Sequence, residues 1–366
     1  MALSLSEAQS PLSCQLCDTP AVIKWRCKDC VLLMCDNCKE RIHPKFKSAE
    51  THVIVSLKDV GKEDSDISAQ FGSLQISKPV ISSVVSTYMT SLPAICQMQY
   101  NPGNDTLFCS YYLDDSTYAY FNIRLLKESV KVLQSFNIEC MDFALNSKGN
   151  IYFAQNPSFV LNVLSSDGVI KTIFSLSHMV ILGIHINKSN EIILGLREQG
   201  PPFPVKTCST RQIAIFGAKN ERKLTIEYDQ KGRKLFSYIW RISTDSDNNI
   251  YAIDQFEKFD GRLVALETCG RAKFIYKGHS SINTSRKPFN PMGIVITKTN
   301  IIIVSDKNNN ALHALNTKGE VIGIQTVTTL GIKRPRSLCL DSEGFLLIGC
   351  YTSTSNAKIH AAKITL

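Results

Sequence analysis

The residues best suited to chemistry in this 366-residue chain are cysteines and histidines near its beginning. Three Cys-x-x-Cys pairs precede two histidines, in the pattern C-x2-C-x9-C-x2-C-x4-C-x2-C-x4-H-x8-H. Zinc prefers thiolate and imidazole ligands, and a Cys-x-x-Cys pair lets two sulfur atoms converge on one ion. Eight ligands make two tetrahedral sets, so the spacing predicts two Zn²⁺ ions bound by Cys14, Cys17, Cys27, Cys30, Cys35, Cys38, His43 and His52.

Disulfides and a redox pair are the alternatives to metal ligands. The N-terminal stretch lacks a basic region followed by an apolar one, and no segment reaches about 18 uninterrupted apolar residues. We therefore expect a soluble, cytoplasmic protein that does not bind membranes, and reducing conditions there disfavour disulfides. A redox pair would leave His43 and His52 unexplained. The other seven cysteines are scattered, and we interpret them as small buried apolar residues.

The predicted metal sites are structural rather than catalytic. Both ligand sets are complete, so neither leaves an open position for water or substrate. The segment is also too short to bury a core of its own, so metal binding should supply most of its folding free energy. The spacing by itself allows sequential or cross-braced pairing of the ligands.

The ligand pattern, with "WRCKDC" and "LMCDNCKERIH", resembles the B-box zinc finger of the tripartite motif (TRIM) family. Cys17 stands where many second-type B-boxes carry histidine. The resemblance implies a docking or weakly self-associating surface. It also implies cross-braced pairing, with Cys14, Cys17, Cys35 and Cys38 on one zinc and Cys27, Cys30, His43 and His52 on the other.

The domain plan that follows differs from that of most TRIM proteins. Thirteen residues precede Cys14, too few for a RING finger, and the polar linker lacks the apolar heptads of a coiled coil. Intrinsic ubiquitin ligase activity and the usual antiparallel dimer are therefore not expected. The predicted segments are a flexible N-terminus at 1–13, a B-box at 14–57, a linker at 58–79 and a repeat domain at 80–366.

From residue 80 onward a unit of short strands and polar turns recurs, as in "CMDFALNSKGNIYFAQ", "WRISTDSDNNIYAID" and "SLCLDSEGFLLIGCY". The last unit has room for only three strands, so a strand around "PVISSVVSTYM" is predicted to complete it and close a ring. The fold class is therefore mostly β, a six-bladed propeller after a small zinc domain. The second strands align, at spacings of 44, 41, 58, 51 and 44 residues, on Leu107, Ile151, Ile192, Ile250, Ile301 and Phe345.

The fifth unit, "PMGIVITKTNIIIVSDKNNNALHALNTKGEVI", is similar to an NHL repeat, in which an aspartate ends the second strand before an Asn-rich turn. Asn310 begins the segment at the Asn-His-Leu position, and the histidine is lost. A B-box followed by an NHL-type propeller is itself a TRIM architecture. The two resemblances together cover most of the chain.

The formal net charge is +9, and three connections that precede the first strands of blades are rich in basic residues. Such connections should share one face of the ring, which we call the top face, and attract an anionic partner, either protein or RNA. Exposed loops are also commonly charged without any partner. The predicted partner-binding residues are Lys231, Arg233, Lys234, Arg286, Lys287, Lys333, Arg334 and Arg336, and loops between second and third strands add Arg197, Lys206, Arg211, Lys258, Arg262 and Lys307.

Enzymatic chemistry is the other function class. The histidines of the repeat domain form no visible Ser-His-Asp or metal constellation, and "DSDNN" at 245–249 resembles a calcium loop but occupies a predicted hairpin turn. We predict no catalytic residues and an interaction protein whose propeller recognises a protein or RNA partner. The alternative is a component of ubiquitin transfer, as a ligase or as a substrate receptor for a RING-bearing partner.

Overall fold

The structure is a computed structural model of residues 1–366. The chain divides into two compact units, Met1–Ile76 and Ser77–Leu366. The predicted flexible N-terminus and nearly all of the predicted linker lie outside the described residues. Those described are 14, 16–17, 23–27, 32–45, 52, 54–56, 78–92, 94–112, 118–125, 129–136, 138, 140–155, 158–257, 259–352 and 356–366.

The first unit contains a small antiparallel sheet and a short helix. The central strand is β1, and Trp25 on it holds the helix in place: its Nε1 donates a hydrogen bond to Asp36 at 2.7 Å, and Lys39 Nζ lies 3.4 Å from its ring centroid. The elements are β1 (Trp25–Cys27), β2 (Leu33–Met34), α1 (Asp36–Arg41), the 3-10 helix η1 (His43–Lys45) and β3 (Ile54–Ser56). Among the described residues, no helix is long and apolar enough to cross a membrane.

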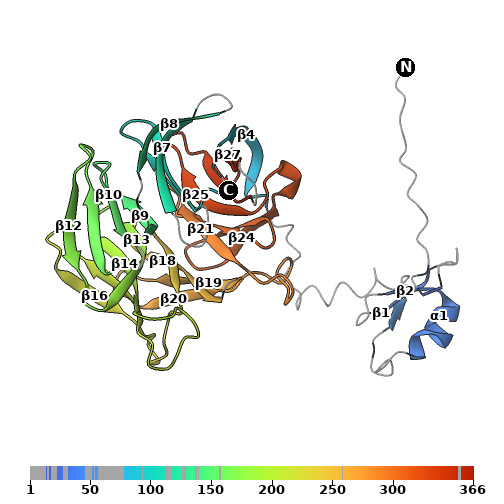
Figure 1. Ribbon diagram of the computed structural model, residues 1–366. Helices are drawn as coiled ribbons and strands as arrows, with labels where there is room; N and C mark the ends of the chain where they lie inside the picture. The colour runs from blue at the N-terminus through green and yellow to red at the C-terminus, as the bar shows by residue number, and fades with distance from the viewer. Residues whose placement is uncertain are drawn as a thin grey trace, which may run out of the picture. The chain divides into compact units, whose positions relative to one another are not determined.

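The second unit is a ring of six four-stranded antiparallel sheets, so the predicted six-bladed propeller is confirmed (Figure 1). In each blade the first strand is innermost. The blades are, in order, β5 (Gln97–Asn101), β6 (Thr106–Tyr112), β7 (Tyr118–Leu125) and β8 (Val130–Phe136); β9 (Cys140–Leu145), β10 (Ile151–Gln155), β11 (Val160–Leu164) and β12 (Ile170–Ser175); β13 (Met179–Ile186), β14 (Ile192–Glu198), β15 (Arg211–Phe216) and β16 (Arg222–Ile226); β17 (Ile239–Thr244), β18 (Ile250–Glu257), β19 (Asp260–Leu266) and β20 (Ala272–Tyr276); β21 (Pro291–Ile296), β22 (Ile302–Asp306), β23 (Ala311–Leu315) and β24 (Val321–Thr326); and β25 (Pro335–Leu340), β26 (Leu346–Cys350), β27 (Lys358–Ile364) and β4 (Ile81–Met89).

The ring is closed by strands from both ends of the propeller sequence. β4 pairs with β27 from Ile81 opposite Ile364 to Met89 opposite Lys358. The predicted closing strand is therefore confirmed. Val80 and Ile81 are fully buried in the apolar cluster between blades 5 and 6, so the closing strand also contributes to the core.

Several turns between first and second strands share one hydrogen-bonding pattern, in which a side-chain oxygen accepts from the backbone N–H groups two and four residues further on. In "DSDNN", Asp245 Oδ1 accepts the backbone N–H groups of Asp247 and Asn249, each at 2.9 Å, while Asn248 adopts a φ of 60°. The other carboxylate oxygen of Asp245, Oδ2, accepts hydrogen bonds from Asn249 Nδ2 and from the hydroxyl of Tyr251. Both carboxylate oxygens are therefore used inside the hairpin, so this segment is a turn and not a calcium loop.

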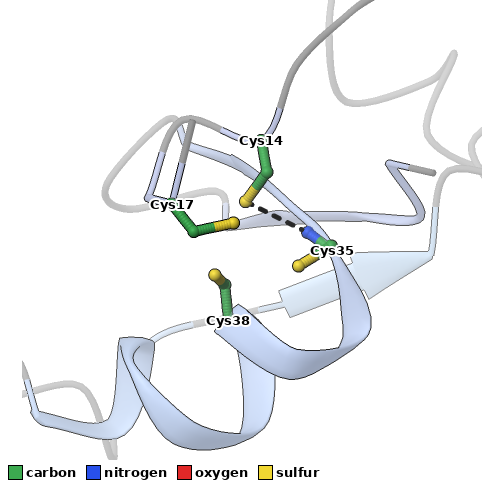
Figure 2. Close-up of side chains that lie close together, drawn as sticks. All are labelled: Cys14, Cys17, Cys35 and Cys38. Carbon is green, nitrogen blue, oxygen red and sulfur yellow. Dashed lines mark hydrogen bonds between the residues drawn. The ribbon is translucent and has the colours of Figure 1, made fainter. Parts of the chain in front are cut away.

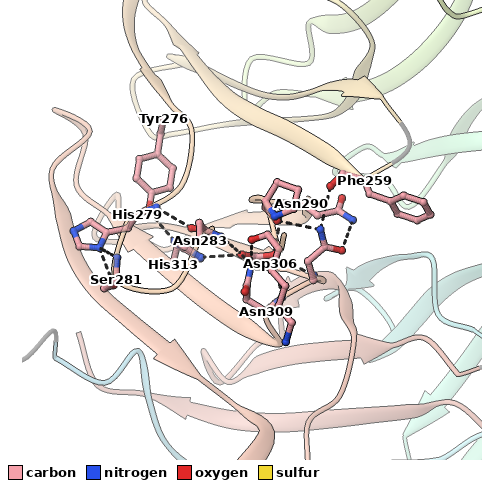
Figure 3. A network of polar contacts seen from close by, with 12 residues as sticks. Phe259, Tyr276, His279, Ser281, Asn283, Asn290, Asp306, Asn309 and His313 are labelled. Carbon is pink, nitrogen blue, oxygen red and sulfur yellow. Dashed lines mark hydrogen bonds and ion pairs between the residues drawn. The ribbon is translucent and has the colours of Figure 1, made fainter. Parts of the chain in front are cut away.

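Asp306 organises the polar centre of blade 5 from a fully buried position (Figure 3). Its Oδ2 accepts from the side-chain amides of Asn283 at 2.7 Å and Asn309 at 2.8 Å, and His313 Nε2 lies 3.5 Å away. The hydroxyl of Tyr276 is hydrogen-bonded to the other ring nitrogen of His313 at 2.7 Å. Burial would raise the pKa of Asp306, but the nearby His313 ring and hydrogen bonds from Asn283 and Asn309 hold it below its usual value.

Replacing Asp306 with alanine should destabilise the propeller by about 3 kcal/mol, because it leaves several buried donors without an acceptor. Urea unfolding at pH 7 measures this change. Asp247→Ala removes an exposed carboxylate and should change the free energy of unfolding by less than about 0.5 kcal/mol. Equal effects of the two substitutions would show that the Asp306 network contributes no stability.

Candidate functional site

Four cysteines of the first unit converge to form a candidate metal centre (Figure 2). The sulfur atoms of Cys14, Cys17, Cys35 and Cys38 all lie within 4.8 Å of one another. Tetrahedral zinc with Zn–S bonds of about 2.3 Å requires sulfurs about 3.8 Å apart, so small side-chain adjustments suffice. The cluster could therefore hold a metal ion, and its four thiolates suit zinc.

Local structure explains how the four sulfurs meet. Cys35 immediately precedes α1 and Cys38 lies in its first turn, and residues three apart point to the same side of a helix. The backbone N–H of Cys35 donates to Cys14 Sγ at 3.4 Å. Burial would raise the pKa of Cys14, but this hydrogen bond, one from Leu16 and neighbouring thiols lower it to about 6. Cys14 thus favours the thiolate, the form that binds metal, whereas burial and hydrogen bonds from Cys17, Cys14 and Cys35 raise the pKa of Cys38.

A second group brings together three of the remaining predicted ligands, in the order along the chain that cross-braced pairing requires. Cys27, His43 and His52 offer ligand atoms within 4.8 Å of one another, and Cys27 Sγ lies 3.7 Å from His52 Nδ1. The two imidazole rings meet edge to face, with centroids 5.4 Å apart. Cys30, the fourth predicted ligand, lies outside the described residues. The assignment of these residues to two zinc ions stays a prediction.

We expect the purified chain to contain two Zn²⁺ per molecule and Cys38→Ser to contain about one, because a three-ligand set loses most of its affinity. Elemental analysis by mass spectrometry after dialysis measures the ratio. Cys350→Ser, a buried cysteine of the propeller, serves as the matched control and should retain both ions. An unchanged zinc content in Cys38→Ser would remove this residue from the ligand set.

An ion pair crosses the centre of the propeller. Arg241, on the innermost strand of blade 4, is 3% exposed and lies 3.5 Å from Asp142 on the innermost strand of blade 2. Its guanidinium also donates to Gln97 at 3.0 Å and to the backbone carbonyl of Cys96 at 3.3 Å, both in blade 1. Blades 1 and 4 lie opposite each other in a ring of six, so the Arg241 side chain spans the central channel.

Asp142 is held in this channel at an energetic cost. Burial raises its pKa to about 6, while Arg241 and the backbone N–H of Ile184 act in the opposite direction. A carboxyl whose pKa rises on folding gives stability below the unfolded value of 3.8 and loses it as the pH rises through about 6. The ion pair with Arg241 therefore offsets part of the free-energy cost of burying the Asp142 carboxylate and does not add a large net stabilisation.

Arg241→Met should make the stability of the propeller more sensitive to alkaline pH. Without the guanidinium the pKa of Asp142 rises further, so the stability deficit relative to the unmodified chain should grow between pH 5 and pH 8. Urea unfolding at both values measures it. Arg271→Met removes an exposed arginine and should show a deficit independent of pH in this range. A constant deficit in Arg241→Met would contradict the proposed pairing.

The predicted partner-binding residues fall into two groups. Lys231, Arg286, Lys287, Lys333 and Arg334 are exposed, and we call these five the basic rim. The connections that carry them join the fourth strand of one blade to the first strand of the next, and such connections share the top face.

Several of the other predicted cations are engaged within the protein. Arg233 forms an ion pair with Asp229 at 2.7 Å, and Lys234 donates to the carbonyl of Ser209. Arg336 was expected in an exposed loop, but β25 already begins at Pro335, so Arg336 lies in the strand. Its side chain is 4% exposed and packs against Trp240. Arg197 and Arg211 are likewise buried within strands, and Lys258 lies outside the described residues.

The interpretation of all scattered cysteines as buried is wrong for two of them, because Cys208 and Cys269 are exposed.

Sequence reasoning missed the residues of the channel and of the top end of blade 6. Asp142 and Arg241 stand in ordinary strand patterns, and nothing local marks them as partners. Tyr351 was also missed, although Lys307, Arg334 and Arg336 all lie within 6 Å of its ring centroid. Bulges in two innermost strands redirect Trp240 and Arg336. No sequence pattern marks these bulges.

Comparison with known proteins supports the fold. No sequence-family profile matches the chain. No curated protein matches it in sequence. A gluconolactonase from Xanthomonas campestris is 9% identical with a TM-score of 0.53, covering 78% of this chain and 94% of its own. A chain provisionally assigned as a gluconolactonase is 11% identical with a TM-score of 0.53, covering 78% and 96%.

A virginiamycin B lyase from Staphylococcus aureus is 13% identical with a TM-score of 0.49, covering 76% of this chain and 99% of its own. At identities this low, the two gluconolactonase-type matches show a shared propeller fold alone.

Proposed function

We propose that this protein is an interaction protein without intrinsic catalysis, similar in plan to TRIM proteins that join a B-box to an NHL-type propeller. In this proposal the top face of the propeller recognises an anionic partner, and the zinc-stabilised N-terminal unit serves for docking or self-association. The basic rim carries the proposal. Its five cations are exposed and come from three successive connections, so their fields add on one side of the ring.

The centre of the propeller argues against carrying over the activity of the gluconolactonases. Arg241 spans the channel, and acceptors from blades 1, 2 and 4 surround its guanidinium. A buried cation that already has its acceptors offers no ligand to a metal ion and no base to a substrate. The fold likeness alone is therefore a weak reason to expect lactone chemistry.

Reversing charge on the basic rim should abolish most anion binding. We expect the triple variant Lys231→Glu, Lys287→Glu, Lys333→Glu to bind polyglutamate and polyuridylate at least about tenfold more weakly at 100 mM salt. Fluorescence anisotropy with labelled polymers measures both affinities. Whichever polymer the unmodified chain binds more tightly then identifies the partner class.

The matched control reverses three exposed lysines in turns that face the other way, Lys148→Glu, Lys219→Glu and Lys318→Glu. Its net charge equals that of the rim variant, so it separates local recognition from total charge. We expect it to retain affinity within about threefold. Equal losses in both triple variants would contradict recognition by the top face.

A further inference from the structure

A cavity of about 580 Å³ opens at the top end of blade 6 and is lined by three cations, Lys333, Arg334 and Lys358. We call it the blade 6 pocket. Its described lining comes from the part of the β24–β25 connection that follows the 3-10 helix η3 (Thr328–Leu330), and from the ends of β26 and β27 with Thr352, Asn356 and Ala357 beside them. No described lining residue is acidic, and none of the three cations forms an ion pair with a described carboxylate. Their charges are therefore available to a ligand.

Described lining residues from both connections are held by backbone hydrogen bonds. The backbone N–H of Arg334 donates to Asn310 Oδ1 at 2.6 Å, and the N–H of Tyr351 donates to the carbonyl of Arg334 at 3.1 Å. Opposite them, the N–H of Ala357 donates to the carbonyl of Leu92 at 2.7 Å. Backbone held in this way at Arg334, Tyr351 and Ala357 loses little entropy when a ligand binds.

His360 supplies a neutral, buried polar group to the lining. It is 3% exposed, its Nδ1 is hydrogen-bonded to Thr87 Oγ1 at 2.9 Å, and its Nε2 has no hydrogen-bond partner among the described residues. Burial lowers the pKa of His360 to about 4, so the ring is neutral at physiological pH. If the Thr87 hydroxyl donates to Nδ1, the ring proton sits on Nε2 and can be given to an acceptor.

We propose that the blade 6 pocket binds a phosphate monoester on a side chain of a partner peptide. The proposal rests on the proposed function, and it specifies the anionic group that the top face recognises. The dianion would lie among Lys333, Arg334 and Lys358 and accept the N–H of His360. Met89, 45% exposed and directly opposite Lys358 in the ladder, offers an apolar contact to a residue beside the phosphorylated one.

A nucleic acid strand fits this pocket less well. Each phosphodiester of a nucleic acid carries one negative charge, and these charges are spread along the strand. A phosphate monoester carries a charge of about −1.5 to −2 on one group, which suits three cations that line one pocket. Bases also bind by stacking on open aromatic rings. The ring of Tyr351 already has Lys307, Arg334 and Arg336 at 5.0, 5.8 and 5.7 Å from its centroid.

The test uses the full chain and acetyl-Ala-Leu-phosphoserine-Leu-Ala-amide, its unphosphorylated form, inorganic phosphate and polyuridylate as probes. By calorimetry, we expect the phosphopeptide to bind at least about tenfold more tightly than the unphosphorylated peptide and more tightly than inorganic phosphate. Lys358→Gln should weaken phosphopeptide binding about tenfold, and Lys358→Arg should restore most of it. Lys363→Gln removes the same charge from an exposed site on the same strand and should change affinity less than twofold.

Equal binding of the two peptides, or equal losses in Lys358→Gln and Lys363→Gln, would overturn the pocket proposal. If Lys358→Gln lost more affinity for polyuridylate than for the phosphopeptide, the result would also overturn the pocket proposal, in favour of an RNA ligand. Lys358 is not part of the basic rim, so the two proposals can fail separately. If the rim variant loses polyanion binding while the unmodified chain ignores the phosphopeptide, the proposed function stands and the pocket proposal fails.

Discussion

Closure of the ring by β4 and β27 is the constraint on which the propeller depends. Each blade buries apolar side chains against both neighbours, so an open ring would expose the facing surfaces of two blades and an unpaired strand edge. The β4–β27 ladder removes that edge, and Val80 and Ile81 extend the core between blades 5 and 6. Only a closed ring brings Arg241 of blade 4 to Gln97 of blade 1 across the channel.

Charge is used in two different ways in the propeller. Inside the ring, Arg241, Asp142 and Asp306 are buried and contact partners within the protein, so their charges are used by the fold itself. On the top face the basic rim is exposed, and at the blade 6 pocket three cations converge without a described carboxylate. Paired charges cannot readily serve a ligand, whereas unpaired ones can. This contrast supports recognition at the rim rather than chemistry in the channel.

Much of this organisation could be predicted from sequence because it depends on local patterns. Turn residues such as Asp245 and Asn248, with alternating strands on either side, mark each blade, and the missing fourth strand of the last unit points to β4. The Cys-x-x-Cys spacing likewise indicates the four cysteines that converge in the candidate metal centre. The Asp142–Arg241 pair could not be predicted, since it depends on which side chains of distant strands face one another.

The burial of Arg336 was missed for a related reason, because a bulge at the start of β25 redirects its side chain. The blade 6 pocket was missed because its lining comes from two connections, and its polar His360 comes from a strand that looks apolar by pattern. Long-range placement of side chains thus sets the limit of what the sequence alone predicts.

The central claim is that anionic partners bind on the top face. Carbodiimide coupling of polyglutamate to the full chain, followed by peptide mass spectrometry, tests it directly, because this reagent joins carboxylates to lysines that they touch. The account predicts coupling concentrated at Lys231, Lys287 and Lys333, with little at Lys148, Lys219 and Lys318, which are also exposed but lie on the opposite face. Equal coupling on both faces, or a preference for the second set, would contradict it.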